Sequence, residues 1–389
     1  MAVNLQSADK ALKTLYLDVV AEQLNDKINP LLARIKRSSN DVWGKEVRKL
    51  AVYGVNGGVG AGTEDGSLPA ANGNNYEQFV LTLKNLYGTI EISDKAMRAS
   101  ANDAGAFVNL LNDEMDGLLK ASALNFGRML FGDGSGRLGR ALTANDGNNV
   151  KVNNKYFMTG MLVEIYDEKG APTALGKRRI VDWDPVNCIV TLDGTLAADA
   201  IKSGYAFYVQ GSKDGEITGL SALFKDSGTI YGLDRSQHKW LVPYMQSNVG
   251  EISETIIQKA IDYLEENAGS KVNFIVCSSG VKRAFMKHLA TYKRNTDVMD
   301  LKGGFKALSF NGIPIVSDRF CPVGTMYLLN TDDFTLHQLC DWKWLESEDG
   351  KILKQNAGKP TYTATLVKYA DLICSKPCGQ AMLSGIAEE

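Results

Sequence analysis

Residues 102–136 read NDAGAFVNLLNDEMDGLLKASALNFGRMLFGDGSG and carry the clearest periodic pattern of the chain. Asn102 or Asp103 can cap the start of a helix, and the glycines at 132, 134 and 136 end it. At ~1.5 Å per residue, a helix over residues 103–131 is roughly 43 Å long, which predicts a helix that crosses an extended subunit. Its apolar residues recur every three or four positions, as on one helical face: Phe107, Leu110, Leu111, Met115, Leu118, Phe126, Met129 and Leu130.

The composition is that of an ordinary globular protein. With 389 residues, of which 44% are hydrophobic, the chain is long enough for two or three domains with sizeable cores. The formal net charge is -2, so the chain has no overall attraction for nucleic acid, which requires clustered positive charge. Any contact with DNA is therefore expected to be local or weak.

The sequence has no uninterrupted run of ~18 apolar residues, and its start, MAVNLQSADK, lacks the apolar core of a signal peptide. We therefore expect a chain that is made and used in a cytoplasm, without a membrane partner. The cysteines are scattered in mostly apolar surroundings, which predicts reduced thiols. They are Cys188, Cys277, Cys321, Cys340, Cys374 and Cys378.

The N-terminal region predicts an arm. Residues 8–35 have a helical apolar pattern that is interrupted near Asn29 and Pro30, so an amphipathic helix is expected to dock on another surface. Residues 34–49 contain six basic residues against two acidic ones. This local positive charge fits either a solvated linker or a phosphate contact, and we favour the linker.

Two strand patterns follow, over residues 46–53 and 76–92. They flank VNGGVGAGTEDGSLPAANGNN, a stretch of about twenty residues, and a loop of that length in a compact domain is either functional or mobile. A long two-stranded arm is not stable alone in water and offers unpaired edges to another chain. We therefore expect residues 46–92 to form a projecting hairpin that finds its partner on a neighbouring subunit.

The segment 150–211 has almost no helical periodicity. MLVEIYD, RRIVDWD, NCIVTLD and YAFYVQG are short strands separated by turns, and they predict a small inserted β-barrel. From residue 215 onward the pattern is α+β. Helices are expected over residues 252–267 and 280–292, strands at KVNFIVCS, GIPIVSD and TMYLLN, and a final long strand at TYTATLVKYADLICSKP.

No catalytic or metal-binding motif stands out. The glycine-rich residues 54–62 fit neither phosphate-binding pattern, and Ser135 lacks the spacing of a nucleophile elbow. Cys374 and Cys378 form one pair, whereas zinc needs about four ligands. The histidines His238, His288 and His337 lie far apart in the sequence. We therefore predict no catalytic residue, no cofactor site and no metal site.

Clustered charges have simpler interpretations. Asp113, Glu114 and Asp116 lie off the apolar stripe of the long helix, so a solvated face is favoured over acid/base chemistry. A basic run predicts a surface or subunit-contact face, complemented by acids elsewhere. The bases are Lys282, Arg283, Lys287, Lys293 and Arg294, and the acids are Asp332, Asp333, Asp341, Glu346, Glu348 and Asp349. A chain of this length without a catalytic constellation favours a structural role over an enzyme.

Four segments and the order of the expected elements carry a resemblance: NLYGTIEISDKAMRAS, LNFGRMLFGDGSG, TIYGLDRSQHKWLVP and KPTYTATLVKYADLICSKP. Together they make the chain similar to tailed-phage major capsid proteins of the HK97 fold. The resemblance implies an α+β fold in six parts: a helical arm (1–45), an extended hairpin (46–92), a peripheral domain with the long helix (93–149), an inserted β-barrel (150–213), an axial domain (214–333), and a return to the peripheral domain with the C-terminal strand (334–389).

The same resemblance implies a homo-oligomer of pentamers and hexamers that forms an icosahedral head around double-stranded DNA. Scaffold, portal and decoration proteins are further implied partners, and the DNA contact is weak and non-specific. The chain would be located in the virion after assembly in the host cytoplasm. An encapsulin-like shell that cages a cargo enzyme is the alternative, and a hydrolase using the acids of the long helix is a third hypothesis, disfavoured because no base or nucleophile accompanies them.

Some members of that family join a loop lysine to an asparagine of another chain. Here residues 50–83 contain no lysine, while Lys49 and Lys84 lie near the hairpin base and are expected to face their own subunit. Formation of an amide bond requires a desolvated amine close to its acceptor. The sequence therefore predicts a shell held by non-covalent contacts.

Overall fold

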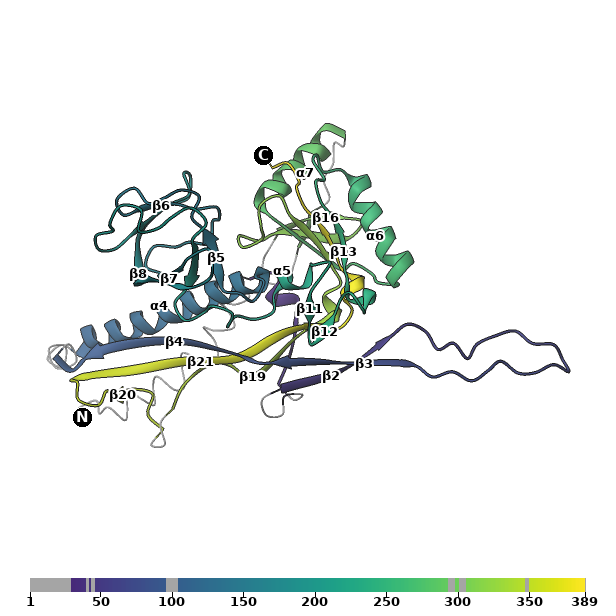
Figure 1. Cartoon of the computed structure of the whole chain (residues 1–389), viewed down its shortest axis with the longest axis horizontal. Helices are drawn as coiled ribbons and strands as arrows, with labels where there is room; N and C mark the ends of the chain where they lie inside the picture. The colour runs from purple at the N-terminus through teal and green to yellow at the C-terminus, as the bar shows by residue number, and fades with distance from the viewer. Residues whose placement is uncertain are drawn as a thin grey trace. The chain divides into compact units, whose positions relative to one another are not determined.

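The computed structural model describes residues 29–39, 42, 46–95, 104–292, 298–300, 306–346 and 350–388. The helix expected over residues 8–35 therefore lies almost entirely outside the described residues. The chain is mixed α+β, as predicted (Figure 1). It divides into two compact units. Unit 1 comprises Met1–Leu83, Leu223–Ile352 and Thr365–Glu389, and unit 2 comprises Lys84–Ala222 and Leu353–Ala364.

Unit 2 contains the predicted long helix, α4 (Ala104–Phe131). One difference from the prediction is that Leu119, not Leu118, is fully buried. Leu118 instead lies against Gly88 of strand β4 (Lys84–Ser93), where an added Cβ would come 3.0 Å from its Cδ1 atom. The buried apolar residues of the described side chains follow one helical face: Met115, Leu119, Ala123, Phe126, Met129, Leu130 and Phe131.

Strand β4 continues unit 2 by pairing with β21 (Thr361–Cys374), whose first residues belong to this unit. The amide of Asp94 donates to the carbonyl of Pro360 at 2.8 Å, and Asn356 donates to the Glu91 carboxylate at 3.1 Å. Strand β20 (Lys354–Gln355) pairs with the opposite edge of β21. These contacts place β4 along the start of the predicted long C-terminal strand.

A six-stranded antiparallel sheet forms the rest of unit 2, in the order β5-β10-β7-β8-β9-β6. It begins at Arg137, earlier than the predicted segment, because Leu138 and Ala141 belong to the same core as Val163 and Phe207. The end strands meet at a bridge between Ala141 and Val152. The strands are β5 (Arg137–Arg140), β6 (Asn149–Lys151), β7 (Leu162–Tyr166), β8 (Pro172–Asp184), β9 (Ile189–Leu192) and β10 (Ala206–Val209).

The largest sheet of unit 1 has seven strands in the order β13-β22-β18-β14-β17-β16-β15. The predicted strands KVNFIVCS, GIPIVSD and TMYLLN lie next to one another in it as β14, β17 and β18. Its strands are β13 (Tyr244–Gln246), β14 (Phe274–Cys277), β15 (Val298–Asp300), β16 (Lys306–Phe310), β17 (Ile313–Ser317), β18 (Met326–Leu329) and β22 (Ala381–Leu383).

Two helices cover one face of this sheet, α6 (Glu254–Ala268) and α7 (Ser279–Tyr292). Both were predicted, with bounds that differ by one or two residues. The side chains of Ile275 and Cys277, which point to the same side of β14, share a core with Ile257 of α6 and Phe285 of α7. The other short elements are η1 (Leu32–Arg34), α5 (Leu220–Leu223), β11 (Thr229–Ile230), β12 (Leu233–Asp234), η2 (Lys239–Leu241), η3 (Thr331–Asp333) and η4 (Pro377–Gly379).

The predicted hairpin is present, but it is shorter than expected. Strands β2 (Glu46–Tyr53) and β3 (Asn75–Thr82) pair over their full length, from Glu46 opposite Thr82 to Tyr53 opposite Asn75. The prediction of one strand over residues 76–92 is wrong, because β3 ends at Thr82 and β4 joins a different sheet. Buried residues occupy odd positions up to Leu83 and even positions from Leu86 onward. The face of the strand that is buried therefore changes between these two residues.

The basic residues after Arg34 are not a free linker, which corrects the sequence interpretation. Strand β1 (Lys36–Ser38) pairs in parallel with β19 (Phe334–Trp344), which in turn pairs with β21. Lys36 forms an ion pair with Asp332 at 3.2 Å, and Arg37 forms one with Asp341 at 3.3 Å. The local positive charge is therefore paired within the subunit at these two positions.

Candidate assembly interface

A group of aromatic rings fixes the base of the β2–β3 hairpin. We call it the aromatic anchor; its members are Tyr53, Phe79, Tyr231, His238 and Trp240. The Trp240 ring stacks on Tyr53 with centroids 5.1 Å apart and lies 5.8 Å from Phe79, which is fully buried. Tyr231 packs on the same Phe79 ring at 5.1 Å, and His238 meets Tyr53 edge-on at 6.4 Å. Both hairpin strands thus contribute one ring to a cluster completed by residues 231–240.

Tyr231 connects the hairpin to the C-terminal strand through its backbone and its side chain. Its carbonyl oxygen accepts from the amide of Val80 in β3 at 3.0 Å, and its hydroxyl oxygen accepts from the amide of Cys374 in β21 at 3.0 Å. Burial raises the pKa of this phenol well above its usual range. These contacts hold the hairpin base in one position against the rest of unit 1.

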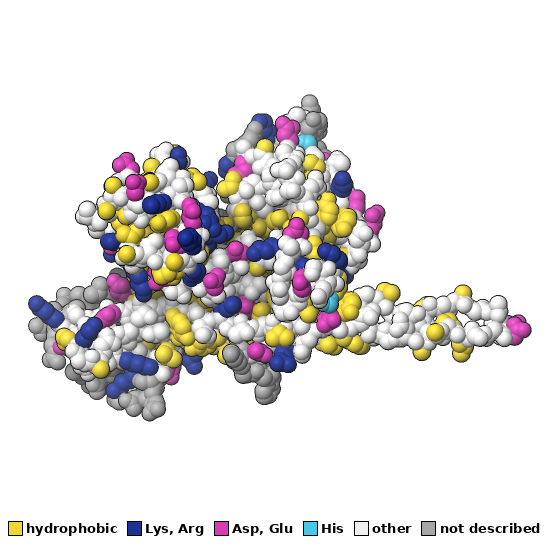
Figure 2. All heavy atoms as spheres, in the orientation of Figure 1, with side chains coloured by type: hydrophobic (Ala, Val, Ile, Leu, Met, Phe, Trp, Pro, Cys, Tyr) yellow, Lys and Arg dark blue, Asp and Glu magenta, His cyan; other side chains and the backbone are white. Residues whose placement is uncertain are grey.

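Beside the anchor and in the connecting loop, the hairpin presents apolar side chains to solvent. Leu50 is 61% exposed, while Val59 and Leu68 in the connecting loop are each 90% exposed. Val52, Val55 and Tyr76 are also among the exposed large hydrophobic residues. Figure 2 shows apolar atoms along this narrow ribbon and acidic atoms at its far end. In the described chain, β2 and β3 form a sheet of their own, and apart from the Val80 amide, which is bonded to Tyr231, their outer edges are available for pairing.

The glycine-rich connection between the strands is ordered by turn contacts rather than by a phosphate cradle. The side chain of Asn56 donates to Asn74 at 3.0 Å across the loop and accepts from the amide of Gly58 at 2.9 Å. At the tip, the amide of Gly66 donates to the carbonyl of Thr63 at 3.2 Å. The loop keeps the two chain segments together as far as the tip.

The predicted basic face is partly present. Arg283 and Lys287 of α7 are exposed and Lys282 is half-buried, whereas Lys293 and Arg294 lie outside the described residues. Lys49 of β2 and Lys84 of β4 are both half-buried, and their orientation toward their own subunit stays a prediction.

The predicted acidic face is wrong at Asp341. Its carboxylate accepts from Lys368 at 2.5 Å and pairs with Arg37, so it is used inside the subunit. Burial opposes ionisation, but these two cations hold the pKa of Asp341 below its usual value. Asp333 is likewise half-buried and accepts from Gln380 at 2.9 Å, while Glu348 and Asp349 lie outside the described residues.

The remaining sequence candidates lie in separate elements of the described chain. Glu114 is exposed and Asp116 half-buried, and the side chain of Asp113 lies outside the described set. His288 packs beside Phe285 at 6.4 Å, while His337 is buried in β19. All six cysteines are free thiols. Among the described residues, no group of three or more His, Cys, Asp or Glu side chains is placed to hold a metal ion.

One buried ion pair was not predicted from the sequence. Arg128, near the end of α4, donates to Glu216, and both side chains are 2% exposed. Arg128 also donates two hydrogen bonds to Asn125, at 3.0 and 2.9 Å. Burial raises the pKa of Glu216 even though Arg128 opposes the shift. The partners are 88 residues apart, so the sequence pattern of α4 gave no sign of this pair.

Within the part of the chain that is described, no helix is both long and apolar enough to cross a membrane. No protein-family model and no curated protein sequence matches the chain.

Comparison with solved structures identifies the fold. The capsid protein in the asymmetric unit of cyanophage A-1(L) matches with a TM-score of 0.56 at 13% identity, covering 92% of this chain and 93% of that one. Weaker matches include the SrpI encapsulin of Synechococcus elongatus PCC 7942, with 10% identity, 93% and 89% coverage and a TM-score of 0.48. A gene transfer agent (GTA) capsid gives 11% identity, 96% and 92% coverage and 0.46. The chain thus has the HK97-like α+β fold of the cyanophage capsid protein.

Proposed function

We propose that this chain is the major capsid protein of a tailed phage, a structural subunit that assembles into pentamers and hexamers of an icosahedral head. The observation that carries the proposal is the anchored hairpin with exposed apolar side chains, found in a chain that shares its fold with a phage capsid protein. A fold alone does not define a function, but a projecting apolar arm requires a partner surface.

The energetics of the hairpin favour burial against a second subunit. Fully burying a large aliphatic side chain contributes roughly 1.5–3 kcal/mol, so covering the six exposed apolar residues contributes on the order of 10 kcal/mol before the entropic cost of association. Those residues are Leu50, Val52, Val55, Val59, Leu68 and Tyr76. The anchor reduces that cost, because the hairpin base is already ordered in the single subunit.

The proposal includes the domain roles that the resemblance implies. We assign residues 46–82 to the extended loop, the seven-stranded sheet with α6 and α7 to the axial domain, and α4 with β4 and the long C-terminal strand to the peripheral domain. The six-stranded sheet from Arg137 to Val209 is proposed as the inserted β-barrel, supported by its separate core and by the bridge between its end strands. Its insertion position makes it a candidate contact for a decoration protein.

Further partners follow from the same role. A scaffold and a portal protein would guide assembly, and double-stranded DNA would be packaged with weak contacts, consistent with a net charge of -2. We propose a non-enzymatic role in the virion, with assembly in the host cytoplasm.

Analytical ultracentrifugation tests the proposal. The purified chain at micromolar concentration is expected to sediment as rings or shells, because closed symmetry satisfies the exposed surfaces of every copy. A variant with Leu50→Ser and Val52→Ser, whose side chains are exposed in the single subunit, should fold but fail to assemble. A wild-type chain that remains a monomer under all salt conditions would contradict the proposal.

A further inference from the structure

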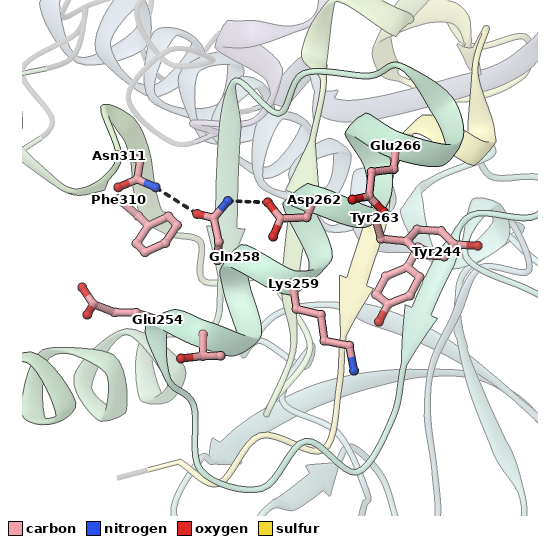
Figure 3. A pocket seen from close by; sticks show the side chains of 10 residues that line it. Tyr244, Glu254, Gln258, Lys259, Asp262, Tyr263, Glu266, Phe310 and Asn311 are labelled. Atoms are coloured by element: carbon pink, nitrogen blue, oxygen red, sulfur yellow. Dashed lines mark hydrogen bonds between the residues drawn. The ribbon is translucent and has the colours of Figure 1, made fainter.

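A groove of about 720 Å³ runs along the outer face of α6 (Figure 3). Its wall combines aromatic rings with carboxylates: Tyr244 and Tyr263 lie with ring centroids 4.4 Å apart, and Phe310 lines the same space. Asp262 and Glu266 are exposed along it. Such a surface favours a ligand that is both cationic and apolar.

One groove carboxylate, that of Asp262, is held in place by neighbouring amides. The side chain of Asn311 donates to Gln258 at 2.9 Å, and Gln258 in turn donates to Asp262 at 2.6 Å, as Figure 3 shows. Among the described residues, neither Asp262 nor Glu266 takes part in a salt bridge. Glu254 adds a third acid and Lys259 one base to the lining, so the groove is negative overall.

A surface of the opposite character lies on α7. Arg283, Met286, Lys287 and Ala290 are exposed at positions i, i+3, i+4 and i+7, which is one helical face. Met286 is 47% exposed between the two cations. We call these four residues the α7 stripe.

The two surfaces match in charge and in spacing. Asp262 and Glu266 are four residues apart on one helix, as are Arg283 and Lys287 on the other, so each pair is separated by ~6 Å along its axis. Met286 would then face the tyrosine rings, a favourable contact for a thioether. We propose that the α7 stripe of one copy binds in the α6 groove of the next copy.

This inference rests on the proposed shell function and names one contact within it. The groove and the stripe are different surfaces of the same chain, so the contact is heterologous, and its repetition by rotation closes a ring. The proposed contact also changes which acids complement the basic residues of α7. Two of the acids predicted for this role, Asp341 and Asp332, are paired within the subunit. The α6 acids supply the complement instead.

Charge reversal tests the contact. One variant carries Asp262→Lys and Glu266→Lys, and a second carries Arg283→Glu and Lys287→Glu. Each should raise the concentration needed for ring formation about tenfold or more, because like charges then face each other. The chain with all four substitutions should assemble as the wild type does. Glu265→Lys is the matched control, because this exposed residue of α6 does not line the groove and its change should have little effect.

Circular dichroism should confirm that all variants fold, since the changed residues are on the surface. Suppose that the wild type forms rings and both reversed variants form them at the same concentration as the wild type. The inference is then overturned while the shell function stands. The same conclusion follows if the chain with all four substitutions does not regain wild-type assembly. If the wild type forms no ring, the proposed function itself fails.

Chemical cross-linking of the wild-type chain tests the same contact without any substitution, so it remains informative if a variant misfolds. Rings assembled from equal amounts of ¹⁴N- and ¹⁵N-labelled chain are treated with a carbodiimide, which joins a lysine amine to a carboxylate in direct contact. Mass spectrometry should find mixed-isotope peptides that join Lys287 to Asp262 or Glu266. Rings without any such mixed pair would overturn the inference.

Discussion

Replacing Phe79 by alanine should detach the hairpin base without unfolding the rest of unit 1. Phe79 is fully buried and contacts the rings of Tyr231 and Trp240 at 5.1 and 5.8 Å. Truncating a buried phenylalanine to alanine costs about 3–5 kcal/mol. The core of the seven-stranded sheet with α6 and α7 does not include Phe79, so the loss should be local.

Hydrogen exchange measures this local loss. At about 1.36 kcal/mol per factor of ten, protection of the amides in β2 and β3 should fall by roughly 10²–10⁴-fold, while the amides of β14 keep their protection. Phe79→Leu is the matched control, because it retains apolar volume and should cost only ~1 kcal/mol. Unchanged protection in β2 and β3 of Phe79→Ala would refute the anchoring role, and equal loss in β14 would refute its local character.

Three further predictions concern stability and covalent state. Burial raises the pKa of Asp318 from 3.8 to about 6, so the folded chain retains a proton that the unfolded chain has lost. The free energy of unfolding should therefore fall by roughly 2 kcal/mol as pH rises from about 4 to 6. Urea unfolding should show this slope in the wild type and its loss in Asp318→Asn. Gly219→Ala would place a Cβ within 2.3–2.7 Å of three backbone carbonyl oxygens at the C-terminal end of α4. The urea midpoint of this variant should drop by an amount equivalent to at least ~2 kcal/mol, and an unchanged midpoint would contradict this close packing. Denaturing gels of assembled particles should show one band near 42.4 kDa, whereas a ladder that survives reductant would point to a covalent link, with Lys49 and Lys84 examined first.

The elements that could be predicted from sequence are those whose signal is local. The long helix α4 follows from apolar residues three or four apart, and α6 and α7 from the same period. The break between β3 and β4 coincides with a change from odd to even buried positions after Leu83. The strand-like alternation on both sides of this point was interpreted as one continuous strand.

The parts that could not be predicted depend on contacts between distant residues. Arg37 and Asp341 are 304 positions apart, and their pairing turns an apparent linker into strand β1. Tyr231 and Trp240 lie in the segment that carried part of the family resemblance, yet their role requires knowledge that Phe79 packs between them. Charge patterns indicated a basic face on α7 but not the partner that we propose for it, because the exposure of an acidic side chain is set by tertiary structure.

Electron cryomicroscopy of particles assembled from the purified chain tests the shell proposal most directly. We expect closed shells containing rings of five and six subunits, in which the β2–β3 hairpin lies on a neighbouring subunit and covers Leu50, Val59 and Leu68. Particles in which the hairpin contacts only its own subunit, or preparations that contain no closed shell at any salt concentration, would contradict the account.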